Sequence, residues 1–323
     1  MRAIAALAGT ALCATLSVPL HAADYPTRSI TMVVPYPPGG PTDIVARTLA
    51  ASMEKTLKQP VVVDNASGAG GTVGSAKVAR APNDGYSLLL NNIGMATTPS
   101  LYRSLPYKPD DFAPIGLVAT MPMVIIARKD LPANNLEELQ AHIRKDPTKV
   151  NYGHSGIGSA AHLCGLLYQS AIKQAVTTVA YKGAAPAMND IMSGQFDFMC
   201  EQTSSTVPFV ESGKVKAMAV TSKQRLAQLP NVPTTAESGL PALDIGVWHG
   251  VYAPKGTPKE VVDRLSAALS EALRDPMVQK RYAEIGAVIA TPEEGQPAPL
   301  MKLQQAEAAR WAPIIKAAAE YAD

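Results

Sequence analysis

The chain has 323 residues, which is long for one small core and typical of two domains or one large α/β unit. Apolar residues make up 47% of it, so we expect a packed interior rather than disorder. The formal net charge is only +2 at pH 7, and this near-neutral balance argues against nucleic acid as the main partner, which would need a concentrated basic face.

The first 23 residues have the layout of a secretory signal peptide. Arg2 precedes an apolar run over residues 4–20, and Ala22 and Ala23 provide small residues for cleavage. A membrane anchor is the alternative, but the run contains Pro19 and is short for the roughly 20 apolar residues that cross a bilayer. We therefore expect residues 1–23 to be removed and the mature protein to be soluble and exported.

From residue 29 the sequence alternates between short apolar runs rich in β-branched residues and segments with helical spacing. Before Pro132, strands are predicted at 30–36, 61–63, 86–90 and 112–127, and helices at 43–58 and 72–80. After it, strands are predicted at 150–153, 177–181, 196–200 and 215–220, and helices at 136–145, 159–172, 186–193 and 207–211. This alternation predicts right-handed crossovers and a mainly parallel sheet.

A proline-rich connector over 229–241 ends the second series and leads to a strand at 245–253. The remaining tail is helical, with apolar spacing from Val261 to Leu273 and an Ala- and Glu-rich segment over 298–321. Because the tail has no sheet of its own, we expect it to pack on the first of two lobes. The predicted fold class is α/β, and a cleft between two lobes would gather the carboxyl ends of strands, where ligands bind.

Three glycine-containing turns lie where a predicted strand meets a helix, at residues 36–43, 155–162 and 181–186. In the first, two glycines let the backbone approach a ligand, and Thr42 or Asp43 can cap the helix that follows. Amides at a helix N-terminus carry about half a positive charge and attract a carboxylate. One such turn is equally an ordinary capped turn, but three in register favour a small anionic solute held by backbone dipoles.

Nucleotides, metals and other cofactors are not expected. The turn with Gly156 and Gly158 resembles a dinucleotide fingerprint, but the acidic residue required about 20 positions later is missing. The glycine-rich stretch at 65–72 lacks the Lys and Ser/Thr ending of a P-loop. No His or Cys spacing typical of a metal site occurs.

Catalytic groups are sparse. Ser159 and His162, three positions apart, form a conceivable relay, so an exported hydrolase is the alternative function. The favoured interpretation is that Ser159 caps a helix and His162 is a partly buried partner. Glu201, at a predicted strand end, is placed to meet a ligand ammonium, with a solvated or lysine-paired carboxylate as an equal alternative.

The cysteine count changes on export. Cleavage would remove Cys13 and leave Cys164 on a predicted helix and Cys200 on a predicted strand. Two cysteines in an oxidising compartment can pair, and neither has the surroundings of a nucleophile. Two buried thiols that never meet are the alternative.

Taken together, the loops resemble the Bug family, the periplasmic solute receptors of tripartite tricarboxylate transporters. The similar segments are 33–43, 65–74, 156–162, 181–183 and 248–258, in the expected order. Segments 162–165 and 199–203 look most like BugD-type, aspartate-binding members, and each contains one of the two cysteines. The resemblance therefore supports a disulfide between Cys164 and Cys200.

The resemblance implies a type II periplasmic binding protein fold with two lobes around a ligand cleft. The first lobe would be discontinuous, over 24–122 and 247–323, and the second would span 123–246. The first turn would hold the ligand carboxylate, and loops of the second lobe would hold the other end. The ligand-binding residues it indicates are Tyr36, Gly40, Thr42, Asp43, Ser155, Gly158, Ser159, Tyr181, Gly183 and Gln202.

The function that the resemblance implies is periplasmic capture of a small carboxylate, without catalysis, cofactor or metal. Aspartate or a C4–C6 dicarboxylate is the expected solute, and membrane permease subunits of a tripartite tricarboxylate transporter are the expected partner. The receptor is expected to be a monomer. The sequence departs from the family at two positions, with Tyr36 where Phe is frequent and Glu201 where Asp is frequent.

Overall fold

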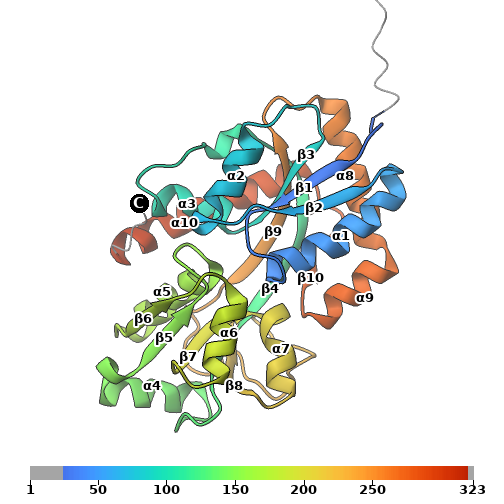
Figure 1. Ribbon diagram of the computed structural model, residues 1–323. Helices are drawn as coiled ribbons and strands as arrows, with labels where there is room; N and C mark the ends of the chain where they lie inside the picture. The colour runs from blue at the N-terminus through green and yellow to red at the C-terminus, as the bar shows by residue number, and fades with distance from the viewer. Residues whose placement is uncertain (1–24, 319–323) are drawn as a thin grey trace, which may run out of the picture.

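A ten-stranded mixed sheet runs through both halves of the molecule in the computed structural model, which describes residues 25–318 (Figure 1). The strands are β1 (Ile30–Val34), β2 (Val61–Asn65), β3 (Ser87–Asn92), β4 (Phe112–Arg128), β5 (Asn151–His154), β6 (Thr177–Ala180), β7 (Phe198–Gln202), β8 (Val215–Val220), β9 (Gly246–Pro254) and β10 (Val288–Ile289). Their order is β2-β1-β3-β9-β4-β7-β5-β6, and β8 and β10 also pair with β4. The predicted signal peptide lies outside the described residues.

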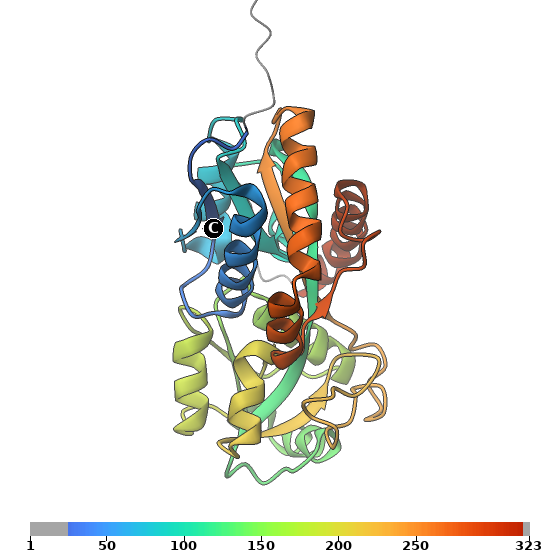
Figure 2. The ribbon, with the colours of Figure 1, turned by 90° about the vertical axis from the view of Figure 1, so that its right-hand side faces the viewer.

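Strand β4 belongs to both halves of the sheet, and Figure 2 shows it extending from the upper half into the lower. Up to Pro122 it pairs with β9 and β10, and from Met123 it pairs with β7 and β8. Most of its 17 residues are buried, which fits its nearly continuous apolar sequence. The predicted lobe boundary at 122–123 falls at this change of partners, and the exact residue bounds of the lobes stay a prediction.

The prediction of a mainly parallel sheet is wrong, because the sheet is mixed. Strand β1 pairs parallel with β2 and β3, and β5 pairs parallel with β6 and β7. All pairings of β4, and that of β3 with β9, are antiparallel. The alternation of strand and helix reports crossovers within each lobe. Strand β9 arrives instead through a connector without a helix, and it lies antiparallel between β3 and β4.

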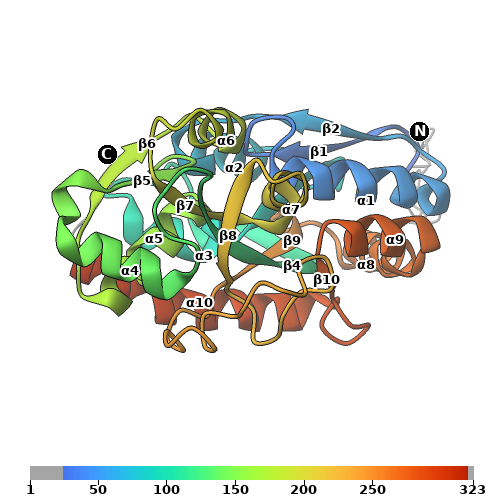
Figure 3. The same ribbon diagram turned by 90° about the horizontal axis from the view of Figure 1, so that it is seen from below.

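Helices cover both lobes. They are α1 (Pro41–Leu57), α2 (Thr72–Ala79), α3 (Gly94–Leu101), α4 (Leu136–Lys145), α5 (Ala160–Ile172), α6 (Ala184–Met192), α7 (Thr203–Glu211), α8 (Lys259–Arg274), α9 (Pro276–Glu284) and α10 (Pro297–Ala318). In the tail, α8 and α9 pack beside α1, and α10 packs on α3 and β4 (Figure 3). No helix within residues 25–318 combines the length and apolar character needed to cross a membrane.

Helix α3 is absent from the sequence-based prediction. Its sequence contains Gly94 and Pro99, which weaken a helical pattern. Six of its residues are nevertheless buried, and α10, about 200 positions later in the chain, packs on it. Tertiary packing therefore stabilises a helix that its local sequence does not predict.

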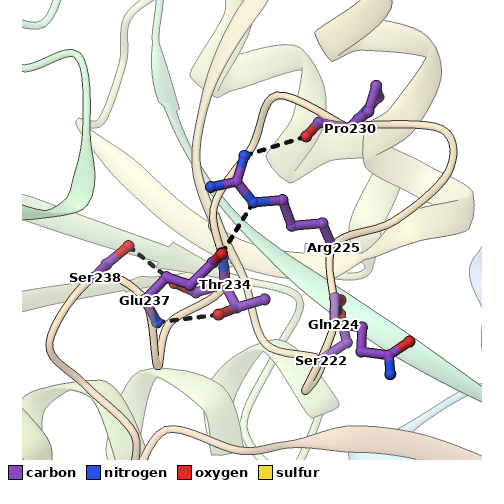
Figure 4. Close-up of polar contacts among 7 residues, drawn as sticks. All are labelled: Ser222, Gln224, Arg225, Pro230, Thr234, Glu237 and Ser238. Carbon is purple, nitrogen blue, oxygen red and sulfur yellow. Dashed lines mark hydrogen bonds and ion pairs between the residues drawn. The ribbon is translucent and has the colours of Figure 1, made fainter.

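The connector between β8 and β9 is braced by its own polar contacts (Figure 4). Arg225 Nε donates to both carboxylate oxygens of Glu237, at 3.2 and 3.0 Å, and its guanidinium also donates to the Pro230 carbonyl. Glu237 accepts the backbone N–H of Thr234, and the Thr234 hydroxyl accepts the backbone N–H of Glu237. These bonds supply partners in a segment without regular secondary structure, through which the chain returns to the first lobe.

A disulfide joins Cys164 of α5 to Cys200 of β7, with the two Cα atoms 6.1 Å apart. Both residues are buried. The predicted disulfide is therefore confirmed, and the alternative of two separate thiols is excluded. The bond connects two elements that both contribute to the cavity described next.

Candidate ligand-binding site

A cavity of about 80 Å³ lies where segments following β1, β5, β6 and β7 meet. Asn92, at the end of β3, completes its wall. A larger neighbouring groove has a volume of about 720 Å³. The residues that line both are Tyr36, Pro37, Ser155, Ser159, Lys182 and Gly183. The cavity therefore lies at the carboxyl ends of parallel strands from both lobes, where α/β sheets bind ligands.

Four helices begin at this cavity. The first residues of α1, α5 and α6 line it, and so does Gln202, the N-cap residue of α7. The Ser159 hydroxyl caps α5 by accepting the backbone N–H of His162 at 3.2 Å. No side-chain hydrogen bond caps α1, α6 or α7. First-turn N–H groups have no partner within their helix, so this cavity gathers free donors and the positive ends of four helix dipoles. Such an arrangement favours an anion.

The wall from the first lobe is a chain of hydrogen bonds. The Tyr36 hydroxyl is the donor to two side-chain oxygens, Asn91 Oδ1 at 3.1 Å and Asn92 Oδ1 at 2.9 Å. The Asn92 amide donates to Thr42 Oγ1 at 3.1 Å, and Thr42 Oγ1 lies 3.3 Å from His249 Nε2. Burial raises the pKa of Tyr36 and lowers the pKa of His249 to about 4, so this wall is uncharged at neutral pH.

Asp43 does not line the cavity but braces the first turn. Its carboxylate accepts the Gly39 backbone N–H at 2.8 Å, Arg47 Nε at 2.9 Å and Asn65 Nδ2 at 2.9 Å. Burial raises the pKa of Asp43, but these hydrogen bonds outweigh it and hold the pKa below its ordinary value. Asp43 thus shapes the turn from beneath, whereas the resemblance indicates it as a ligand contact.

The wall from the second lobe contains a buried carboxyl group. The Ser155 hydroxyl donates to Glu201 Oε2, and the Gln202 backbone N–H donates to Glu201 Oε1 at 2.8 Å. Glu201 is 2% exposed, and burial raises its pKa. The side-chain oxygen of Gln202 is buried and has no hydrogen-bond partner among the described residues. Two acceptor groups therefore belong to this side of the cavity.

The residues indicated by the resemblance fall into three groups. Those that line the small cavity are Tyr36, Gly40, Thr42, Ser155, Ser159, Gly183 and Gln202. Tyr181 lines only the larger groove, and Asp43 and Gly158 line neither space. The sequence analysis missed Asn92 and Lys182, which do line the cavity. Two adjacent asparagines at the end of an apolar strand, Asn91 and Asn92, were the available signal for the first of these.

Glycines allow loops of the two lobes to approach closely. A Cβ on Gly70 would lie 2.9 Å from the carbonyl oxygen of Ile157, and one on Gly158 would lie 2.9 Å from Leu101 Cδ2. A Cβ on Gly183 would lie 3.2 Å from Pro37 Cγ. The glycine turns thus do more than expose amides, because they also let the lobes meet around the cavity.

Ser159 and His162, the two residues of the hydrolase alternative, both make structural contacts at the start of α5. The Ser159 hydroxyl receives a backbone N–H as the cap of α5, and His162 Nδ1 accepts the Gly158 backbone N–H at 3.3 Å. The predicted capping role of Ser159 is confirmed. Within residues 25–318, no group of three or more His, Cys, Asp and Glu side chains could hold a metal ion.

Two α/β lobes, a strand shared between them and a cavity at converging helix N-termini define a periplasmic binding protein fold. The family model for the tripartite tricarboxylate transporter family receptor, TctC, matches residues 45–319, and the chain belongs to this family. The expected family and fold class are therefore confirmed.

Three similar proteins illustrate the relationship. The "UPF0065 protein in the TAR-I ttuE-ttuC' intergenic region" of Agrobacterium vitis is 45% identical over 295 residues, which are 91% of this chain and 85% of that protein. The structure of the periplasmic binding protein BugD is 48% identical, with a TM-score of 0.88, and covers 92% of this chain and 99% of its own. MatC from Rhodopseudomonas palustris, solved with bound malate, is 38% identical, with a TM-score of 0.86 and coverage of 90% and 100%.

Proposed function

We propose that this protein captures a small carboxylate in the periplasm and passes it to the permease subunits of a tripartite tricarboxylate transporter. The observation that carries the proposal is the convergence of four helix N-termini on one cavity, three of them without a side-chain cap. A carboxylate there would accept hydrogen bonds from backbone amides and neutralise the helix dipoles.

The proposed solute is aspartate or a C4–C6 dicarboxylate. The malate bound by MatC supports a ligand of this size and charge. We propose contacts from the cavity-lining residues of both lobes, with Tyr181 facing the larger groove and with Asp43 and Gly158 shaping the turns. The larger groove would provide room for the longer members of this ligand class.

The proposal includes export through the signal peptide at 1–23 and a monomeric mature protein. Its first lobe would span 24–122 and 247–323, and its second lobe 123–246. The proposal includes no catalytic step. The capping role of Ser159 supports binding rather than hydrolysis, because its hydroxyl already receives a backbone N–H. Turnover of an ester or amide that Ser159→Ala abolishes would contradict this part of the proposal.

A thermal-melting screen of the refolded mature protein tests the proposal. Refolding removes any ligand retained from the cell, and the screen compares carboxylates with uncharged analogues. We expect at least one carboxylate to raise the melting temperature, because a ligand at 100 times its Kd adds about 2.7 kcal/mol of stability. If no carboxylate does so, the proposed function is wrong.

A matched pair of variants tests the role of charge at the cavity. Ala185 is an exposed residue in the first turn of α6 and lines the cavity. Ala185→Asp places a carboxylate beside the ligand, and we expect about tenfold weaker carboxylate binding by repulsion. Ala185→Asn has nearly the same size without the charge and should bind more tightly than Ala185→Asp. Because an acidic residue in a first turn stabilises a helix, unfolding would not explain the loss.

A further inference from the structure

Glu201 is a buried carboxyl group at the end of β7 whose protein partners carry no charge. The Ser155 hydroxyl and the Gln202 backbone N–H donate to its two oxygens. No ion pair involves Glu201 among residues 25–318. Because a buried carboxylate without a cation is costly, a cation supplied by the ligand would stabilise this group.

Gln202 adds a second acceptor at the same place. Its side chain is 4% exposed and lines the cavity, and its Oε1 has no hydrogen-bond partner in the described part of the chain. Because an amide oxygen only accepts hydrogen bonds, Gln202 Oε1 is available to a donor. A ligand group that binds here must therefore donate hydrogen bonds.

The remaining cavity wall has the opposite character, because the first turns of α1 and α6 offer N–H donors. We infer that Glu201 and Gln202 bind the ammonium group of an amino-acid ligand while the helix N-termini bind its carboxylate. This inference rests on the proposed function and selects, among its solutes, an amino dicarboxylate. A dicarboxylate without an amine would leave Glu201 without a cation and add a like charge nearby.

Calorimetric titration of the refolded mature protein with matched ligand pairs tests the inference. Aspartate and succinate differ only by the ammonium group, as do glutamate and glutarate, and malate carries a neutral hydroxyl donor instead. We expect the amino member of at least one pair to bind about 10- to 100-fold more tightly than its partner, as for a hydrogen-bonded charge. Malate should fall between aspartate and succinate.

Glu201→Gln removes the charge with little change in shape. We expect the preference for the amino ligand to fall at least about tenfold, with binding of the amine-free partner unchanged or tighter. The variant should fold, because it removes an unpaired buried charge, and its melting temperature verifies this. The control Glu211→Gln, at the exposed C-terminal end of α7, should keep both affinities.

The outcomes separate the two proposals. The inference is overturned if amine-free ligands bind as tightly as their amino partners, or if Glu201→Gln keeps the preference, and the carboxylate receptor then still stands. If no carboxylate binds at all, the proposed function itself is wrong, and the inference that rests on it is wrong too.

Discussion

Thr42 and His249, 207 positions apart in the chain, meet at the floor of the first-lobe wall. Their contact extends the hydrogen bonds of Tyr36 and Asn92 into a network that bears no charge at neutral pH. Because this wall is neutral, the charge at the cavity comes from the helix N-termini, Glu201 and Lys182. At the scale of the residue, discrimination between ligands would therefore depend on few groups.

The buried His249 gives the protein a defined acid sensitivity. Burial lowers its pKa from 6.5 to about 4, so between these values the unfolded chain holds a proton that the folded chain lacks. The contribution of neutral His249 to the free energy of unfolding is therefore fully present above about pH 6.5. It falls as the pH drops toward 4, by up to about 3 kcal/mol. Urea denaturation across this range should show a flatter profile for His249→Gln, whereas His142→Gln on α4 should retain the wild-type slope. Equal slopes in the wild type and His249→Gln would contradict the prediction.

Helix α5 and strand β7 are cross-linked in the second lobe. The disulfide ties α5, whose N-cap is Ser159, to β7, which ends with Glu201 and Gln202. The cross-link thus sets the position of one helix N-terminus relative to the acceptor groups across the cavity. The disulfide therefore constrains the relative position of a whole helix and a whole strand.

Removing the disulfide should destabilise the protein. The 36-residue separation between Cys164 and Cys200 predicts a loss of about 4 kcal/mol for the Cys164→Ala, Cys200→Ala double variant, from the entropy of the unfolded chain. Urea denaturation measures this loss. A reducing agent should lower the melting temperature of the wild type but not of the double variant. A double variant as stable as the wild type would show that the cross-link does not constrain the unfolded state.

At the scale of the whole molecule, two segments connect the lobes, β4 at residues 122–123 and the connector that leads into β9. Helix α10 also contacts α5 of the second lobe. The lobes meet closely at Gly70, Gly158 and Gly183, so the structure has the geometry of a closed receptor. Opening would require bending at only a few residues, which is typical of hinged lobes.

Small-angle scattering should detect closure on binding. We expect the radius of gyration to decrease when the ligand identified by the melting screen is added. Gly183→Ala should reduce this decrease, because its Cβ would lie 3.2 Å from Pro37 Cγ of the other lobe. Gly194→Ala, at the other end of α6, is the control, since it also has a positive φ but no atom within 4 Å. Both variants should lose about 1 kcal/mol of stability from backbone strain. Identical closure of both variants would contradict the steric argument.

Much of the site is visible in the sequence because its parts are local. A β-branched run, a glycine turn and a helical period lie next to one another in the chain, so the turns at 36–43, 155–162 and 181–186 could be located. Their role in anion binding stays a prediction. Cys164 and Cys200 could be proposed as partners because each lies within a recognisable segment. Lobe number and fold class follow from the repeated alternation of strands and helices.

Tertiary structure alone decided the rest, because those features depend on groups far apart in the chain. One such feature is the antiparallel pairing of β4 with β9, and another is the packing of α10 on α3. Each brings together segments that are far apart in the chain. The resemblance indicates Asp43 as a ligand contact, and the fold adds that its carboxylate binds Arg47 and Asn65, neither of which lines the cavity. The sequence by itself determined which turns offer backbone amides, because a turn depends on residues that are neighbours in the chain. The fold decided which side chains face those amides, because the cavity wall is built from residues far apart in the chain.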